Sequence, residues 1–136
     1  MYEFEIRGNH DNPRGNPVPY TRTLSHAWRN DATRYKQWLR HVLNSFLSNY
    51  NKDKEVLNIY THGKPLVLGP DEMAQMDITI FWKNKRHGDP DNIFKGIADA
   101  LFYDDREVYG SIKLGGFSDK PRVKVNIKIC KLKQKK

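Results

Sequence analysis

Residues 76–105 read MDITIFWKNKRHGDPDNIFKGIADALFYDD, and four segments of different character follow one another within them. Residues 76–82 are rich in β-branched and aromatic side chains, which predicts a strand. A basic loop follows at residues 83–87. Asp89 and Pro90 then predict the start of a helix, because an aspartate N-cap accepts orphan backbone N–H groups and proline is tolerated at the first helical position.

The helix and the turn after it form an acidic segment in a basic protein. Residues 89–105 hold five of the sixteen acidic residues and a single lysine, which gives a formal charge of −4. The whole chain of 136 residues carries +8, so the remainder carries +12. Such a distribution favours a cation at the acidic segment and an anionic partner around it, such as a nucleic acid. A solvated surface that happens to be basic is the alternative.

The acidic side chains of this segment have a regular spacing. Asp91, Lys95 and Asp99 are four residues apart, so they share one face of the predicted helix beside its apolar stripe. Asp104 and Asp105 follow in a turn. Hard divalent cations such as Mg²⁺ take carboxylate oxygens and water, and a nearby lysine stabilises negative charge that develops on a phosphate. Taken singly, the same residues are a cap, an exposed ion-pair ladder and a turn, which remains the structural alternative.

Other metal and phosphate motifs fit the sequence less well. An EF-hand loop that began at Asp89 would need glycine and glutamate where the chain has Phe94 and Ala100. The five histidines show no zinc-binding pair at helical spacing, and there is no glycine-rich phosphate loop. Cys130 is the only cysteine, so no disulfide can form within the chain.

The rest of the chain predicts an α+β fold in a single domain, residues 1–136. Strict alternation predicts a strand at residues 2–7, and a 4-3-4-3 apolar spacing predicts a long helix at about residues 31–49. Further strands are expected at residues 56–60, 65–68, 109–114 and 122–129, the last two being antiparallel. We therefore expect a small mixed or antiparallel sheet packed against this long helix and a short helix at about residues 90–102.

The chain shows no pattern for membrane insertion or export. Its first residues lack the basic and apolar regions of a signal peptide, and no apolar run approaches the ~20 residues that cross a bilayer. We expect no membrane partner.

Residues 88–101, GDPDNIFKGIADAL, and residues 104–108, DDREV, resemble the core motif of the RusA family of Holliday junction resolvases, which are common in phages and prophages. That motif has Asp-x-Asp-Asn, a lysine four residues after the second aspartate, Asp-Ala-Leu, and an Asp-Asp pair before a strand. All of these are present in order. Residues 15–22, GNPVPYTR, resemble more weakly the family's proline-rich segment.

The strong resemblance covers about residues 76–129 and the weak one residues 2–45. Residues 51–74 look like an insertion, and residues 131–136 form a basic tail.

The resemblance implies a dimeric α+β endonuclease that uses Mg²⁺, with Mn²⁺ as an alternative ion, to resolve four-way DNA junctions by paired symmetric nicks. It assigns Asp89 and Asp91 to the first two catalytic, metal-binding carboxylates. Asp105 matches the third, with Asp104 as its competitor, and Lys95 matches the catalytic lysine. The expected location is the cytoplasm of a bacterial cell or a phage-infected host.

The basic remainder is expected to contact the phosphates of the junction, while Asp99 is assigned to structural support. The candidate phosphate contacts lie in two basic loops: Arg14, Arg22, Lys83, Lys85 and Arg86. Two other functions stay open, a non-catalytic nucleic-acid-binding module and a metal-dependent nuclease for other branched DNA or for RNA.

Overall fold

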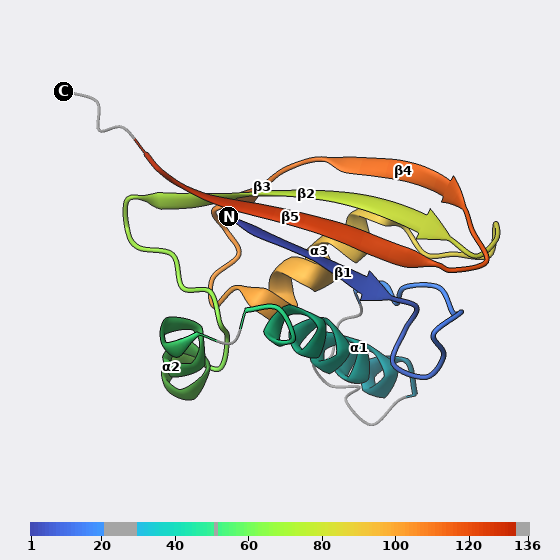
Figure 1. The fold of residues 1–136 in the computed structure, drawn as a ribbon, viewed down its shortest axis with the longest axis horizontal. Coiled ribbons are helices and arrows are strands. Elements are labelled where there is room, and N and C mark those ends of the chain that lie inside the picture. Colours follow the sequence, from blue (N-terminus) through green and yellow to red (C-terminus); the bar gives the residue numbers. More distant parts are fainter. Residues whose placement is uncertain (21–29, 51, 133–136) are drawn as a thin grey trace.

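A computed structural model describes residues 1–20, 30–50 and 52–132, and in this part of the chain a mixed sheet packs against helices (Figure 1). The strands are β1 (Tyr2–Arg7), β2 (Glu72–Trp82), β3 (Val108–Tyr109), β4 (Ile112–Phe117) and β5 (Arg122–Lys131). The helices are α1 (Asn30–Leu47), α2 (Asp53–His62) and α3 (Pro90–Leu101). The predicted α+β class, with a small mixed sheet against one long and one short helix, is confirmed.

The sheet is organised around β2. One edge of β2 pairs with β5 in antiparallel fashion, and β1 pairs antiparallel with the far edge of β5. The other edge of β2 pairs in parallel with β3 and, further along, with β4. Parallel neighbours need a crossover connection, and α3 supplies it. The helix therefore begins at the end of the sheet where β2 ends and runs back toward the start of β2.

The predicted strand at residues 56–60 is wrong, because these residues lie in α2. A short run of apolar residues fits both the helical and the strand period, so the residues at the two ends of the segment decide which structure forms. Two acids occupy the first turn, and Gly63 ends the helix at φ +81°, where its N–H donates to the carbonyl of Ile59. The Tyr2 hydroxyl also donates to Glu55 over 2.9 Å, which ties the helix to β1.

The predicted strand at residues 65–68 is also wrong. Of this segment, Leu66 alone makes an isolated bridge, with Phe102 just after α3. Its backbone N–H donates to the carbonyl of Leu101, and its carbonyl accepts from Tyr103. Residues 51–74, expected as an insertion, thus contribute α2, a connection fastened to the end of α3, and the first residues of β2.

The predicted strand at residues 109–114 is divided in two. Gly110 lies where a Cβ atom would be 1.6 Å from the carbonyl oxygen of Met76, and β3 and β4 lie on either side of it. β4 then continues to Phe117. It pairs with β2 rather than with β5, so the two expected antiparallel strands flank β2 instead of forming a ladder with each other.

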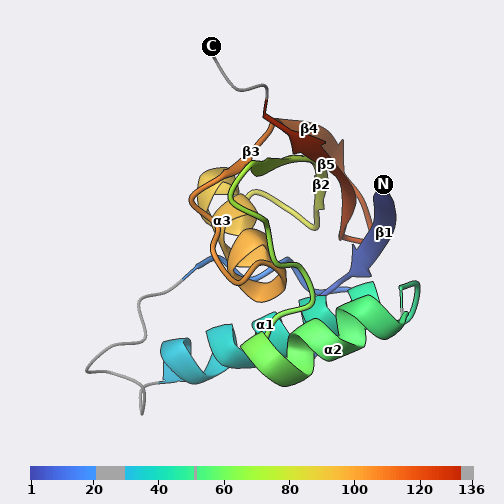
Figure 2. The ribbon, with the colours of Figure 1, turned by 90° about the vertical axis from the view of Figure 1, so that its left-hand side faces the viewer.

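One face of the sheet carries the core. Alternate side chains of β1, β2 and β5 point to this face, and α1 and α3 cover it (Figure 2). α1 contributes Tyr35, Trp38, Val42 and Phe46, all buried and spaced three or four residues apart. No helix of the described residues covers the opposite face, which carries polar and charged side chains. No helix among them is long and apolar enough to cross a membrane.

Candidate functional site

Asp89 is the N-cap of α3, as the sequence predicted. Its Oδ1 atom accepts the backbone N–H of Asp91 over 2.9 Å, and Pro90 occupies the first helical position. The carboxylate of Asp91 is exposed and makes no hydrogen bond to a described residue. The second oxygen of Asp89 and both oxygens of Asp91 therefore have no hydrogen-bond partner in residues 1–20, 30–50 and 52–132, and both residues are exposed.

The loop before Asp89 is fixed by the segment that follows β1. The Asn16 side chain accepts the N–H of Lys83 over 2.6 Å and donates to the carbonyl of Arg86 over 2.9 Å. Gly88 lies where a Cβ atom would approach Pro19 to 2.8 Å, so a larger residue would push the two segments apart. These contacts set the direction in which the chain enters α3.

An aromatic contact also holds this loop. The ring of His87 stacks on the ring of Trp82 at the end of β2, with 3.9 Å between centroids and 9° between planes. Because Trp82 is buried, the stack attaches the loop to the core two residues before Asp89.

Lys95 lies one turn beyond Asp91 on the same face of α3. Its Nζ atom is 4.2 Å from the centroid of the Tyr20 ring, within the range of a cation–π interaction. The N–H of Tyr20 donates to the carbonyl of Asn92 over 3.0 Å, which fixes the tyrosine against the helix. The ammonium group is thus oriented by the loop from β1 and remains exposed near Asp91.

Asp99, two turns beyond Asp91, takes part in holding α1 against α3. The buried Tyr35 hydroxyl donates to its carboxylate over 2.8 Å. Burial raises the pKa of Tyr35 above its usual value, and the hydrogen bond and the charge of Asp99 raise it further. Lys64 donates to the backbone carbonyl of Asp99. These contacts agree with the structural role that the sequence indicated.

Asp104 and Asp105 lie beyond the other end of α3 and differ in their contacts. Asp104 pairs with Arg106 through both carboxylate oxygens, the shortest contact being 2.6 Å, and hydrogen bonds from that guanidinium hold the pKa of Asp104 below its usual value. The Asp105 carboxylate has no hydrogen-bond partner among the described residues. Its charge adds a small contribution to the raised pKa of Tyr35.

The single chain does not bring the three expected carboxylates together. Asp91 and Asp99 are about 12 Å apart along the helix axis, and Asp105 lies at the Asp99 end. Ligands of one Mg²⁺ ion each lie about 2 Å from the metal. Within the described ranges no group of three histidine, cysteine or acidic side chains is arranged to hold a metal ion. A hydrated Mg²⁺ ion needs only one or two protein carboxylates beside water and phosphate, and Asp89 and Asp91 supply two carboxylates at the start of α3.

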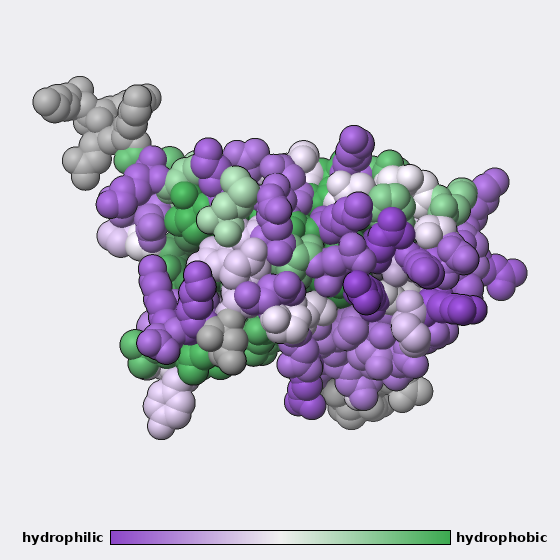
Figure 3. Space-filling view, viewed as in Figure 1, coloured by the Kyte–Doolittle hydropathy of each residue, from purple (hydrophilic) through white to green (hydrophobic). Residues whose placement is uncertain are grey.

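The predicted phosphate contacts gather at the Asp89 end of the molecule. Arg14, Lys83, Lys85 and Arg86 are exposed there, and the face of this end seen in Figure 3 is mostly hydrophilic. Arg22 lies outside the described residues. Lys120 and Arg122 lie at the same end and were not predicted. The alternation of residues 122–129 could have indicated Arg122, because it shares the polar side of that strand with Lys124 and Lys128.

No family model and no curated protein matches the chain.

Proposed function

We propose that this protein is a Mg²⁺-dependent endonuclease that nicks four-way DNA junctions, as its resemblance to the RusA family implies. The observation that carries the proposal is that two exposed carboxylates stand at the start of α3, Asp89 as the N-cap and Asp91 in the first turn, directly after a basic loop. Lys95 follows one turn beyond Asp91 on the same face and is oriented by the Tyr20 ring. Carboxylates bind the metal, and the basic side chains around them attract the phosphates that the metal must reach.

The residues of this site have separate tasks. Asp89 and Asp91 would hold the ion through the oxygens that capping leaves free. A bound Mg²⁺ ion would supply the Lewis acidity that activates water and neutralises charge on the phosphate. Lys95, positioned by Tyr20, would contact a non-bridging oxygen of the same phosphate and stabilise the charge that develops there.

A two-fold dimer would bring Asp91 of one subunit and Asp105 of the other together. In a two-fold dimer, every contact between two residues occurs twice. If the two α3 helices lie antiparallel across the two-fold axis, the start of each helix lies beside the end of the other. We propose that Asp105 reaches Asp89 and Asp91 of the second subunit. The pairing of Asp104 with Arg106 favours Asp105 as the third carboxylate. Two such sites match the two symmetric nicks that a four-way junction requires.

The proposal is tested by the variant Asp91→Asn. It should abolish nicking of a synthetic four-way junction in Mg²⁺ and keep or improve junction binding, because it removes a negative charge that faces phosphate. Gel analysis of nicked strands and a binding titration in EDTA measure the two properties. Nicking at the wild-type rate would disprove the metal assignment. A linear duplex, a flap and an RNA duplex, tested alongside, show whether the nuclease prefers other substrates.

The second candidate is a nucleic-acid-binding module without catalysis. The separation of Asp91 from Asp105 within one chain favours it, since a cap, a Tyr35–Asp99 hydrogen bond and an Asp104–Arg106 pair account for acidic residues without a metal. This function predicts binding that is independent of Mg²⁺ and no nicks at any protein concentration, so the same assay separates it from the first.

A further inference from the structure

A basin of about 680 Å³ opens at the end of the sheet where β1 stops and β5 starts. Its wall carries four basic side chains, from β1, the loop after it, the β4–β5 turn and β5. They are Arg7, Arg14, Lys120 and Arg122. Glu5 and Asp119 are the acidic members of the lining, so basic groups outnumber acidic ones by two to one.

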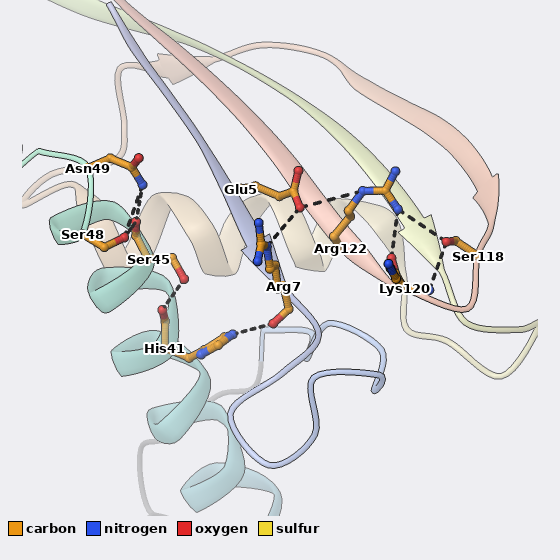
Figure 4. Close-up of polar contacts among 9 residues, drawn as sticks. All are labelled: Glu5, Arg7, His41, Ser45, Ser48, Asn49, Ser118, Lys120 and Arg122. Carbon is orange, nitrogen blue, oxygen red and sulfur yellow. Dashed lines mark hydrogen bonds and ion pairs between the residues drawn. The ribbon is translucent and has the colours of Figure 1, made fainter.

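One carboxylate positions two of the arginines. Glu5 Oε1 lies 3.5 Å from Nε of Arg7 and 3.9 Å from Nε of Arg122 (Figure 4). Both distances exceed those of a strong charge-assisted hydrogen bond. A guanidinium carries five N–H donors, so most of those on Arg7, whose side chain is 84% exposed, remain available to another anion.

The other contacts of Arg122 make it a fixed part of the wall. Its Nη1 atom donates to the carbonyl of Lys120 over 2.9 Å, and its guanidinium lies 3.9 Å from the centroid of the Phe81 ring. Gly115 is adjacent to this ring, where a Cβ atom would come within 2.5 Å of it. Arg122 is therefore held in place before any ligand arrives, which lowers the entropic cost of binding one.

The basin is connected to the Asp89 end of α3. Arg14 belongs to the loop after β1, and two residues later Asn16 bonds the loop that leads to Asp89. The carbonyl of Arg7 accepts a hydrogen bond from His41 if Nε2 carries the proton, which also anchors the end of β1 to α1. Basin and candidate metal site thus share one end of the molecule (Figure 1).

We propose that this basin binds the phosphodiester backbone of a DNA duplex and so holds one arm of the junction beside the Asp89–Asp91 site. The fixed Arg122, the exposed Arg7 and Arg14, and Lys120 present guanidinium and ammonium groups that suit phosphate oxygens. The choice of DNA rests on the proposed function. The binding itself does not need catalysis, so it is measured in EDTA and survives a failure of the nuclease proposal.

The first test removes two exposed basin charges. Arg14→Ala with Lys120→Ala keeps the backbone bonds at both positions and spares the structural Arg122. The salt slope is the slope of log affinity against log salt concentration, and each lost phosphate contact reduces its magnitude by about 0.9. Raising the salt from about 50 to about 200 mM should therefore weaken the double variant about tenfold less than it weakens the wild type. Anisotropy titrations of a fluorescein-labelled duplex measure this. The control, Lys52→Ala with Lys54→Ala, removes the same charge near α2 at the other end and should leave the slope unchanged.

The second test adds affinity. Glu5→Gln keeps the size and acceptor oxygen of the side chain but removes the negative charge inside the basin, so it should tighten duplex binding by about two- to fivefold. Glu107→Gln, an exposed change near β3, is the matched control and should have no effect. The proposal would be overturned if the Arg14/Lys120 and Lys52/Lys54 double variants changed the salt dependence of duplex affinity equally. No gain in duplex affinity from Glu5→Gln would also overturn it. The proposal would also be overturned if the protein bound phosphatidylserine vesicles more tightly than the duplex and lost that binding in the Arg14/Lys120 double variant.

Discussion

The two ends of α3 both carry aspartates, yet they are built differently. At the N-terminal end, Asp89 and Asp91 keep oxygens that no described side chain or backbone group bonds, and an exposed basic loop precedes them. At the C-terminal end, Asp99 accepts a hydrogen bond from a buried tyrosine, and Asp104 is paired with an arginine. Asp105 is the exception at that end, since its carboxylate has no partner among the described residues.

This contrast shows how identical residue types in one segment divide between chemistry and packing. A carboxylate whose hydrogen bonds are satisfied by the fold has little left to offer a metal or a substrate. The carboxylates of Asp89, Asp91 and Asp105 keep at least one oxygen that no described residue bonds. The family resemblance assigns the same three to the metal, with Asp104 as the competitor of Asp105. Asp89 and Asp91 lie at one end of the helix and Asp105 at the other, so a shared metal site would require two subunits.

The largest effect should distinguish Asp105 from its neighbour. Asp105→Asn should lower junction nicking at least about 100-fold, because a metal ligand accounts for several kcal/mol of transition-state stabilisation. Asp104→Asn should stay within about threefold of wild type, because its exposed pair with Arg106 contributes little. Rates of strand nicking under single-turnover conditions measure both. The reverse pattern would assign the third carboxylate to Asp104.

Mixing two inactive variants should restore part of the activity. If Asp105 acts in the partner's site, a dimer of one Asp91→Asn chain with one Asp105→Asn chain contains one intact site. Random exchange makes half of the dimers mixed, so about a quarter of the wild-type nicking sites should return. These dimers should nick one strand and fail to resolve the junction, which denaturing gels detect. No recovery after verified subunit exchange would place all three carboxylates in one chain's site.

The smallest effect belongs to the structural end. Tyr35→Phe removes the hydrogen bond to Asp99 and should lower the free energy of unfolding by about 1 kcal/mol, without changing duplex affinity. Urea denaturation measures this, with the exposed Tyr60→Phe as the control. A change in duplex affinity, with stability intact, would move Asp99 from the structural to the functional group.

The Tyr35→Phe variant should also change how the free energy of unfolding depends on pH. The raised pKa of Tyr35 means that its stabilisation is complete below the unfolded value near pH 10 and is lost as the pH rises toward the folded value. Tyr2, whose pKa burial and the bond to Glu55 raise to about 12, acts in the same direction. The alkaline loss of stability should therefore persist in Tyr35→Phe but be smaller than in wild type.

The sequence predicted those elements whose local signals agree. α1 and α3 were expected within two residues of their ends, and the aspartate cap of α3 was expected by position. β2 was expected from residue 76 and begins at Glu72. In these segments the spacing of the apolar residues, the capping residues and the helix-breaking residues all predict the same structure. Tertiary contacts therefore change these elements little. The site residues were assigned from the motif and its spacing alone, and their roles stay a prediction.

By itself, then, the sequence determined the fold class and the long and short helices. It also singled out the carboxylates and the lysine of the candidate site, whose role in catalysis stays a prediction. Only the tertiary structure decided that residues 53–62 form α2, that β4 joins β2 in parallel, and which aspartates are engaged by Tyr35 and Arg106. The physical reason is that periodicity and capping act between neighbours in the chain, whereas pairing and burial depend on residues far apart in it.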